Sequence, residues 1–215
     1  MLKYLLFDLD NTLYSSSYGL EDNVVHRIKK FAASFLGISP DEVWRQRMAQ
    51  EKKYGTCLEW LVAEKGFTDY EAYLAAAHPP DEADTLPLND VLRAFLSGLA
   101  FPKAILTNSP MEHADRILNK LGITDLFTHI FDIRFCNYAG KPRPEVYRRT
   151  LEVLGYSAGE VLFIDDNRYY IEGYIALGGH AVLFDENDVH TNLPLPRIRE
   201  LGELTRVIEE IINNK

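Results

Sequence analysis

The pattern of hydrophobic and polar residues changes twice along the chain. A short apolar run at residues 3–7 is bounded by charge, which predicts a strand buried on both faces of a parallel sheet. Across residues 15–85 the apolar positions recur at the three- and four-residue spacing of amphipathic helices. After Pro87, short apolar runs alternate with helical patterns. This alternation predicts parallel β-α-β units joined by right-handed crossovers.

Start and stop signals locate the individual elements. Ser39-Pro40-Asp41-Glu42 has the form of a capping box with proline at the first helical position, and Gly37 and Gly66 are placed to end helices. The helices predicted within residues 15–85 are Val24–Leu36, a second that begins at Pro40, Cys57–Lys65 and Asp69–Ala77. Beyond them, strands are predicted at residues 104–106, 130–135, 161–164 and 181–184, with helices at 89–97, 110–121, 144–154, 169–177 and 201–212.

These elements predict an α/β fold, a doubly wound Rossmann-like parallel sheet core with an inserted all-helical cap domain. Residues 1–14 and 86–215 would form the core, and residues 15–85 would form the cap, inserted directly after the first strand. The length of 215 residues suits one buried core with one modest insertion.

Charge and cysteine content exclude several classes of protein. The formal net charge of −9 repels nucleic acid and anionic membranes, so neither is expected as a partner. The first residues are too few and too acidic for a signal peptide, and no apolar run approaches the roughly 18 residues of a membrane span. Cys57 and Cys136 lack the spacing of a zinc site or a disulfide framework. A cytoplasmic location with reduced cysteines is expected, and the oligomeric state is left open.

The large aromatic residues and the histidines carry little functional signal in this sequence. Tyr18, Trp44 and Trp60 are expected in the core, because large aromatic residues at helical spacing are usually buried. Tyr14 and Tyr54 are the two aromatics expected to face a crevice, because they lie near loops or helix ends. The histidines show no pairing or ligand spacing and are expected to be surface or core residues: His26, His78, His113, His129, His180 and His190.

Polar residues with chemical capability follow three of the predicted strands. Because ligands bind at the carboxyl ends of the strands in an open parallel sheet, these residues are expected to meet in one crevice, with Lys141 at its rim. Four carboxylates in one crevice raise one another's pKa unless a cation compensates, and oxygen ligands without histidine or cysteine favour Mg²⁺. The residues are Asp8 with Asp10, Thr107 with Asn108, and Asp165 with Asp166.

The motifs at these positions resemble those of the haloacid dehalogenase superfamily, whose phosphotransferases use an aspartate nucleophile. The DxDxT motif of that superfamily matches Asp8-Leu9-Asp10-Asn11-Thr12. Its strand-end Ser/Thr matches Thr107, its lysine matches Lys141, and its acidic pair matches Asp165-Asp166. The resemblance implies that Asp8 attacks phosphorus to form an aspartyl-phosphate. It also implies that Asp10 protonates the leaving alcohol and then activates water.

The same resemblance implies roles for the other site residues. Thr107, Asn108 and Lys141 would bind the phosphate oxygens. Mg²⁺ would be bound by Asp8, by the backbone carbonyl of Asp10, and by Asp166 with Asp165 beside it. Dehalogenases of the superfamily lack the second acid of DxD, so Asp10 favours phosphate chemistry over halide chemistry.

Within the superfamily, residues 8–14, 53–56, 106–110 and 131–133 look most like the pyrimidine 5'-nucleotidase subgroup. This likeness implies a pyrimidine nucleoside 5'-monophosphate as substrate, with cap and loop contacts from Tyr14, Tyr54 and Thr56. Arg143, inside the Lys-Pro-x-Pro motif, departs from the family pattern. It either adds a phosphate contact, which could shift substrate choice, or has no role.

Other interpretations of these residues and of the function remain open. An acid after a strand can simply cap the next helix, and Lys141 could be a solvated surface residue. The core motifs do not separate a nucleotidase from a phosphatase or phosphomutase for another small metabolite, such as a sugar phosphate. A catalytically silent protein that binds a phosphate ligand is a further alternative.

Overall fold

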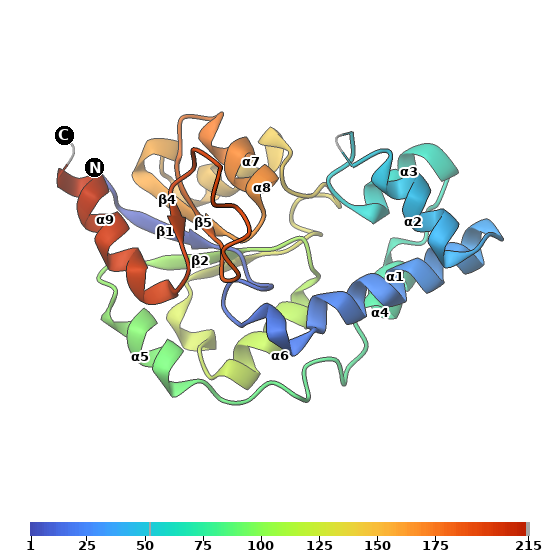
Figure 1. Ribbon diagram of the computed structural model, residues 1–215, viewed down its shortest axis with the longest axis horizontal. Coiled ribbons are helices and arrows are strands. Elements are labelled where there is room, and N and C mark those ends of the chain that lie inside the picture. Colours follow the sequence, from blue (N-terminus) through green and yellow to red (C-terminus); the bar gives the residue numbers. More distant parts are fainter. Residues whose placement is uncertain (52, 214–215) are drawn as a thin grey trace.

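The computed structural model describes residues 1–51 and 53–213, which contain a six-stranded parallel sheet (Figure 1). Its strand order is β3-β2-β1-β4-β5-β6, which confirms the doubly wound arrangement. The strands are β1 (Tyr4–Phe7), β2 (Lys103–Leu106), β3 (His129–Phe131), β4 (Val161–Asp165), β5 (His180–Phe184) and β6 (Arg197–Ile198). The last of these was not predicted, because a two-residue strand leaves no apolar run to detect.

Helices flank the sheet on both faces, and a further group lies beside it (Figure 1). Helices α7 and α8 cover one face, while α5, α6 and α9 cover the other. The flanking helices are α5 (Asp90–Gly98), α6 (Met111–Leu121), α7 (Pro144–Leu154), α8 (Arg168–Ile175) and α9 (Leu204–Asn213). The separate group consists of α1 (Leu20–Leu36), α2 (Pro40–Met48), α3 (Cys57–Lys65) and α4 (Tyr70–Ala77).

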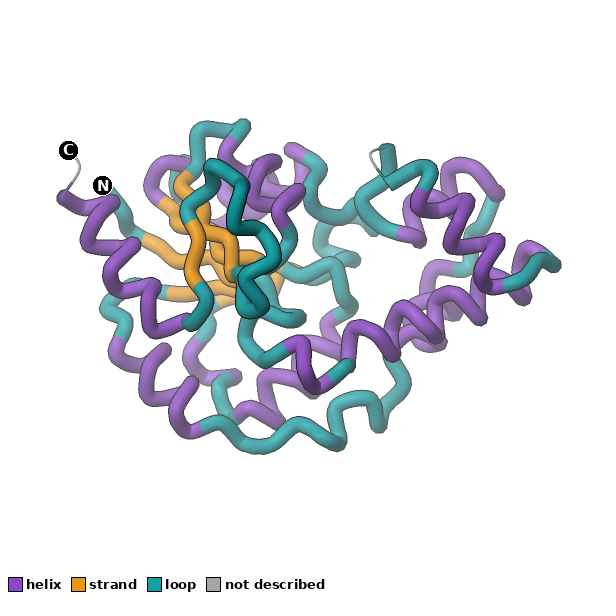
Figure 2. Tube along the Cα trace, in the orientation of Figure 1, coloured by secondary structure: helices purple, strands orange, loops and turns teal. Residues whose placement is uncertain are grey.

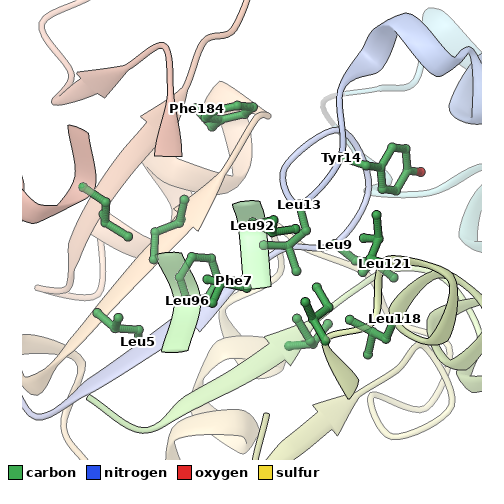
Figure 3. Packing of buried hydrophobic residues seen from close by; sticks show 14 of the residues in the cluster. Leu5, Phe7, Leu9, Leu13, Tyr14, Leu92, Leu96, Leu118, Leu121 and Phe184 are labelled. Carbon is green, nitrogen blue, oxygen red and sulfur yellow. The ribbon is translucent and has the colours of Figure 1, made fainter. Parts of the chain in front are cut away.

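Strand β1 is buried on both sides because successive side chains of a strand point to opposite faces. Leu5 and Phe7 belong to a cluster that includes residues of α5, α6 and α9 (Figure 3). Tyr4 and Leu6 belong to a second cluster, with residues of α7 and α8. Burying a large apolar side chain contributes about 1.5–3 kcal/mol, so both layers hold β1 firmly. This packing fixes the position of Asp8, the next residue along the chain.

Helices α1–α4 form a group beside the sheet (Figure 2). This group has a hydrophobic cluster of its own. In the described part of this segment, residues 15–51 and 53–85, no strand occurs. Gly37 and Gly66 end α1 and α3 in the left-handed conformation, with φ of 66° and 69°. Ser39 caps α2 as predicted, but the Glu42 side chain binds Arg45 instead of completing the capping box.

The predicted strand at residues 130–135 is wrong at its carboxyl end. β3 ends at Phe131, and the buried carboxylate of Asp132 then fixes a turn. This carboxylate accepts the backbone N–H of Phe135 at 2.8 Å and that of Met111, the first residue of α6, at 3.1 Å. Ile133 consequently leaves the sheet and packs into the cluster of α1–α4.

The turn after β3 attaches the helical group to the core. Arg134 forms an ion pair with Glu71 of α4 at 2.6 Å, and the Tyr138 hydroxyl donates to the same carboxylate at 2.9 Å. The rings of Tyr70 and Tyr138 pack with their centroids 4.4 Å apart. These contacts join α4 to the core at a place other than the two connecting segments.

Neither cysteine takes part in a disulfide. Cys57 and Cys136 are buried and free, as the sequence predicts. Burial raises the pKa of each thiol to about 11, so both are protonated at neutral pH. Among the described helices, none is long and apolar enough to cross a membrane.

We predict that Asp132→Ala lowers the free energy of unfolding by about 2–4 kcal/mol, because two backbone N–H groups lose their shared acceptor. Urea unfolding followed by circular dichroism measures the change. Asp125→Ala, which removes an exposed acid from the segment between α6 and β3, is the control and should cost less than about 1 kcal/mol. Equal losses in the two variants would show that Asp132 does not hold this turn.

Candidate active site

The predicted strand-end residues meet at the carboxyl edge of the sheet. The chain proceeds from β1 towards β3 on one side and from β4 towards β6 on the other, so the topology reverses between β1 and β4. Open α/β sheets bind ligands at such a switch point. Asp8 follows β1 and Asp165 ends β4, and the Asp8 N–H donates to the Ile164 carbonyl at 2.8 Å. Neighbouring strands therefore set the separation of these two carboxylates.

A buried ammonium group lies between these carboxylates. Lys141 Nζ is 2.5 Å from Asp8 Oδ1 and 2.7 Å from Asp165 Oδ2, and its side chain is only 1% exposed. Burial alone would lower the pKa of Lys141, but the charges of Asp165 and Asp8 outweigh burial and raise it. Lys141 is therefore a buried cation, and the alternative of a solvated surface lysine is excluded.

A group of three acids surrounds this ammonium. Carboxylate oxygens of Asp8, Asp165 and Asp166 lie within 4.8 Å of one another. Burial is the largest cause that raises the pKa of each, and neighbouring carboxylates add to it. Lys141 compensates only part of this negative charge. The donor set consists of oxygens alone, so it fits Mg²⁺ better than a transition metal.

Residues after β2 hold the Lys141 turn in place. Asn108 Oδ1 accepts the Lys141 N–H at 2.8 Å, and Asn108 Nδ2 donates to the Lys141 carbonyl at 3.4 Å. The buried Thr107 hydroxyl accepts the Ser109 N–H at 3.0 Å. Thr107 and Asn108 thus begin the turn into α6, and both line the same cavity as Lys141.

The Asp10 carboxylate is held by different groups. Its Oδ1 accepts from the Tyr14 hydroxyl at 2.6 Å and lies 2.7 Å from His113 Nε2, while its Oδ2 accepts from the Ser109 hydroxyl at 2.9 Å. Burial opposes ionisation of Asp10, but His113 and Tyr14 outweigh burial and hold its pKa well below the usual range. The pKa of Asp8 is therefore raised and that of Asp10 is lowered, which suits unlike chemical roles.

Sequence reasoning missed the histidines behind Asp10. His113 Nδ1 lies 2.8 Å from Glu82 Oε1, and His78 Nδ1 lies 3.0 Å from Glu82 Oε2. Arg116 donates to the same carboxylate at 2.6 Å. The expectation that the histidines lack partners is thus wrong for His78 and His113. The four-residue spacing of His78 and Glu82 was a usable signal, but the approach of His113 depends on tertiary packing.

His113 is the cation of this cluster. Burial alone would lower the pKa of His113, but Asp10 and Glu82 raise it to about 10. The ring atoms of His78 and His113 and the Glu82 oxygens are close enough to share a metal ion. A protonated imidazole does not ligate a metal, however, and Arg116 already compensates Glu82. The cluster therefore links α6 to the segment after α4 through ion pairs.

A cavity of about 250 Å³ opens over the strand ends. Among the three expected substrate contacts, Thr56 lines it. The Tyr14 hydroxyl is bonded to Asp10, and Tyr54 is buried in the cluster of α1–α4 with its hydroxyl donating to Glu64 at 2.5 Å. The cavity walls formed by described residues do not include either tyrosine. They do include Trp44, which was expected in the core.

The helical group touches the Lys141 turn closely at the edge of the cavity. A Cβ added to Gly55 would lie 2.5 Å from the Lys141 carbonyl oxygen, and one added to Gly140 would lie 2.5 Å from Thr56 Cγ2. Arg143, in the same turn, forms an ion pair with Glu59 of α3. Its guanidinium therefore joins the core to α3 through Glu59.

Known proteins resemble this chain over most of its length. Residues 2–178 match the haloacid dehalogenase-like hydrolases. Phosphate metabolism protein 8 of Saccharomyces cerevisiae is 29% identical over 203 residues, which cover 84% of this chain but only 61% of the yeast protein. Hexitol phosphatase A of Escherichia coli is 25% identical over 220 residues, which cover 99% of this chain and 94% of that protein.

Solved structures share the fold. The HAD phosphatase from Thermococcus onnurineus has a TM-score of 0.63 with this chain at 23% sequence identity. The match covers 96% of this chain and 98% of the archaeal one. The chain and this structure therefore share the same overall fold.

We predict that stability falls as pH rises from about 7 to about 10, because of His113. The pKa of His113 is about 10 in the folded protein against 6.5 for a free side chain, so the folded state holds an extra proton over this range. Its stabilising contribution is complete below the unfolded pKa and is lost as pH rises through the folded one. The expected slope is a loss of about 1 kcal/mol per pH unit.

Urea unfolding at about pH 7, 8 and 9 measures this slope. His113→Gln should flatten it, while His26→Gln, which changes an exposed residue of α1, should keep the wild-type slope. A slope that is the same in His113→Gln and the wild type would contradict the prediction.

Proposed function

The chain belongs to the haloacid dehalogenase-like hydrolases, and on this premise we propose that it is a Mg²⁺-dependent phosphomonoesterase that acts through an aspartyl-phosphate. One observation carries the proposal: Asp8 faces the Lys141 ammonium and two further acids, while Asp10 is held separately by His113. A nucleophile and a proton carrier need such unlike surroundings. Phosphatases among its relatives, such as hexitol phosphatase A, support the same class of reaction.

Asp8 is the nucleophile of the proposed reaction. One of its carboxylate oxygens attacks phosphorus, the bond from phosphorus to the leaving alcohol breaks, and an aspartyl-phosphate forms. Water then attacks phosphorus, the bond from phosphorus to Asp8 breaks, and inorganic phosphate leaves. Lys141, Thr107 and Asn108 would hold the oxygens of the transferred group throughout.

Asp10 is the proposed proton carrier. The departing alkoxide takes a proton from Asp10, and the attacking water later returns one to it. The depressed pKa of Asp10 means that this carboxyl is ionised before substrate enters. A phosphate dianion placed beside it raises its pKa by repulsion, which favours the protonated form needed in the first step. His113, bonded to Asp10 Oδ1, would keep the carboxylate oriented during both transfers.

The acidic group would hold the metal ion. When bound, Mg²⁺ offsets the charge of the phosphate and of the attacking carboxylate. Asp8, Asp166 and the Asp10 backbone carbonyl are the proposed ligands, with Asp165 beside them. Asp165 Oδ2 is bonded to Lys141 and its Oδ1 accepts the Asn167 N–H at 2.8 Å, so it would chiefly position the lysine.

The leading substrate candidate is a pyrimidine nucleoside 5'-monophosphate. The support is the likeness of residues 8–14, 53–56, 106–110 and 131–133 to that subgroup, together with apolar side chains on the helical side of the cavity. The name of the Escherichia coli relative, hexitol phosphatase A, favours a second candidate, a phosphatase for a sugar phosphate. A phosphomutase for such a metabolite is a further alternative. A silent binding protein has less support, because Asp8, Asp10 and Lys141 are all in place.

The proposal also includes the organisation of the chain. The cap would comprise residues 15–85 and the catalytic core residues 1–14 and 86–215. The two buried free cysteines are in keeping with a cytoplasmic location.

We predict that the protein releases inorganic phosphate from nucleoside monophosphates in the presence of Mg²⁺ and that chelation by EDTA abolishes the release. A panel of nucleoside monophosphates and sugar phosphates, assayed for free phosphate, identifies the preferred class. Transfer of the phosphoryl group to a second hydroxyl instead of water would identify a mutase. Folded protein that releases phosphate from no member of the panel would overturn the proposal.

We predict that Asp8→Asn reduces kcat by at least about 1,000-fold while the fold is kept, because the amide is a far weaker nucleophile. Loss of the buried carboxylate also relieves repulsion with Asp165, so the melting temperature should not fall much. Asp22→Asn, an exposed acid of α1, is the matched control and should keep wild-type activity. Turnover within about tenfold of the wild type would mean that another group attacks phosphorus.

A further inference from the structure

Arg47 is a buried arginine whose guanidinium is only partly satisfied. It lies on α2, is 7% exposed and lines the cavity. Its Nη2 donates to the backbone carbonyls of Tyr54 at 3.1 Å and Gly55 at 3.3 Å. Its Nη1 is buried and has no hydrogen-bond partner among the described residues. A buried donor without a partner is rare in folded proteins and calls for an explanation.

The charge of Arg47 is also without a counter-ion. No carboxylate of the described residues forms an ion pair with it, and its hydrogen bonds go to neutral carbonyls. Its positive charge reaches Cys57 and Tyr73, where it opposes the pKa increase that burial causes. Both of these residues line the cavity. A buried cation kept beside a cavity is typical of a site that receives an acceptor from a ligand.

The cavity has two chemically different sides. On the sheet side it is lined by Asp8, Lys141 and Asp166, which are assigned above to phosphate and metal. On the helical side its walls are mostly apolar, and Arg47 supplies positive charge there. The apolar lining residues of that side are Val24, Val25, Ile28, Trp44, Leu58 and Leu74. A ligand that fills the cavity therefore meets charge on one side and apolar walls with one unsatisfied donor on the other.

We propose that Arg47 is a specificity-determining residue that donates from Nη1 to an acceptor oxygen on the leaving group of the substrate. This inference rests on the proposed phosphatase function and adds the class of leaving group. The group has an apolar or planar body that fits the walls around Trp44 and Leu58, and it carries an oxygen acceptor. A ring carbonyl and a carboxylate both have this chemistry, and the experiment separates them.

A purely structural role is the competing explanation. Arg47 holds the Tyr54 and Gly55 carbonyls, and Gly55 packs against the Lys141 turn. Removal of the guanidinium would then disturb the turn and slow every substrate equally. If Arg47 instead recognises the substrate, removal of its guanidinium slows only the substrates that carry the acceptor. The ratio of the kcat/KM values of two substrates, measured with the same variant, therefore distinguishes the two roles.

The test compares kcat/KM for two matched pairs of substrates. Uridine 5'-monophosphate and ribose 5-phosphate share the reacting centre and differ in the ring with its carbonyls. 4-Carboxyphenyl phosphate and phenyl phosphate differ in the carboxylate. The variants are Arg47→Met, which keeps the length but removes the donors, and Arg47→Gln, which keeps a neutral donor. Arg45→Met, an exposed arginine of the same helix, is the control.

In the wild type we expect kcat/KM to be higher for the acceptor-bearing member of one pair, either uridine 5'-monophosphate or 4-carboxyphenyl phosphate, than for its partner. Arg47→Met should reduce that preference by about 10- to 100-fold, mainly through KM, whereas Arg45→Met should leave it unchanged. Recovery of part of the preference in Arg47→Gln identifies a neutral carbonyl as the acceptor. If Arg47→Gln recovers none of the preference, and the preference is lost only in the pair of 4-carboxyphenyl phosphate and phenyl phosphate, the acceptor is a carboxylate. Equal losses for both members of both pairs would overturn the inference.

Two controls keep this inference separate from the proposed function. If wild-type protein cleaves neither pair nor any other phosphomonoester, the proposed function fails, whereas phosphate release without any Arg47-dependent preference defeats only the inference. If Arg47→Met does not fold, calorimetry on Asp8→Asn with Mg²⁺ present replaces the kinetics. Tighter binding of one acceptor-bearing compound than of its partner by about tenfold supports the inference, and equal affinities in both pairs overturn it.

Discussion

A single ammonium group enclosed by carboxylates is the interaction on which the site depends. Without Lys141, Asp8 and Asp165 would face each other in a buried place, and one of them would stay protonated. The ammonium reaches this place because two adjacent parallel strands bring the acids together and because Asn108 holds the lysine backbone from both sides. The ends of β1 and β4 and the turn around Lys141 must therefore all be in place before the Asp8 carboxylate pairs with the ammonium.

Asp10 depends on a different set of contacts, so the two acids have unlike surroundings. The chain after β1 bends so that Asp10 meets His113 of α6, while Asp8 stays with the lysine. Glu82 fixes the charge of His113 and lies in the segment that returns from α4 to the core. The connection of the helical group is thereby coupled to the orientation of the Asp10 carboxylate through Glu82 and His113.

The sequence predicted what depends on local periodicity and strand topology. Apolar runs that end in Asp8, Thr107 and Asp165 were enough to place these residues together, because parallel strands share one carboxyl edge. The end of β3 was misjudged because the Asp132 carboxylate, and not hydrophobicity, ends the strand. His113, Glu82 and Arg47 carry no motif. The contacts of His113 with Asp10 and Glu82 join residues far apart in the chain, and the unpaired Nη1 of Arg47 is a feature of the packed structure, so spacing along the sequence encodes neither.

The location of these unpredicted residues bears on how substrate choice is encoded. The motif residues lie on the sheet and its turns, whereas the apolar walls of the cavity come from α1–α4, which have their own hydrophobic cluster. Trp44 and Leu58 line the cavity from α2 and α3, so residues outside the sheet set the shape of this part of the cavity. Family motifs therefore report the reaction and not its substrate. The buried Nη1 of Arg47 is informative for this reason, since its desolvation is a cost that packing within α1–α4 does not explain.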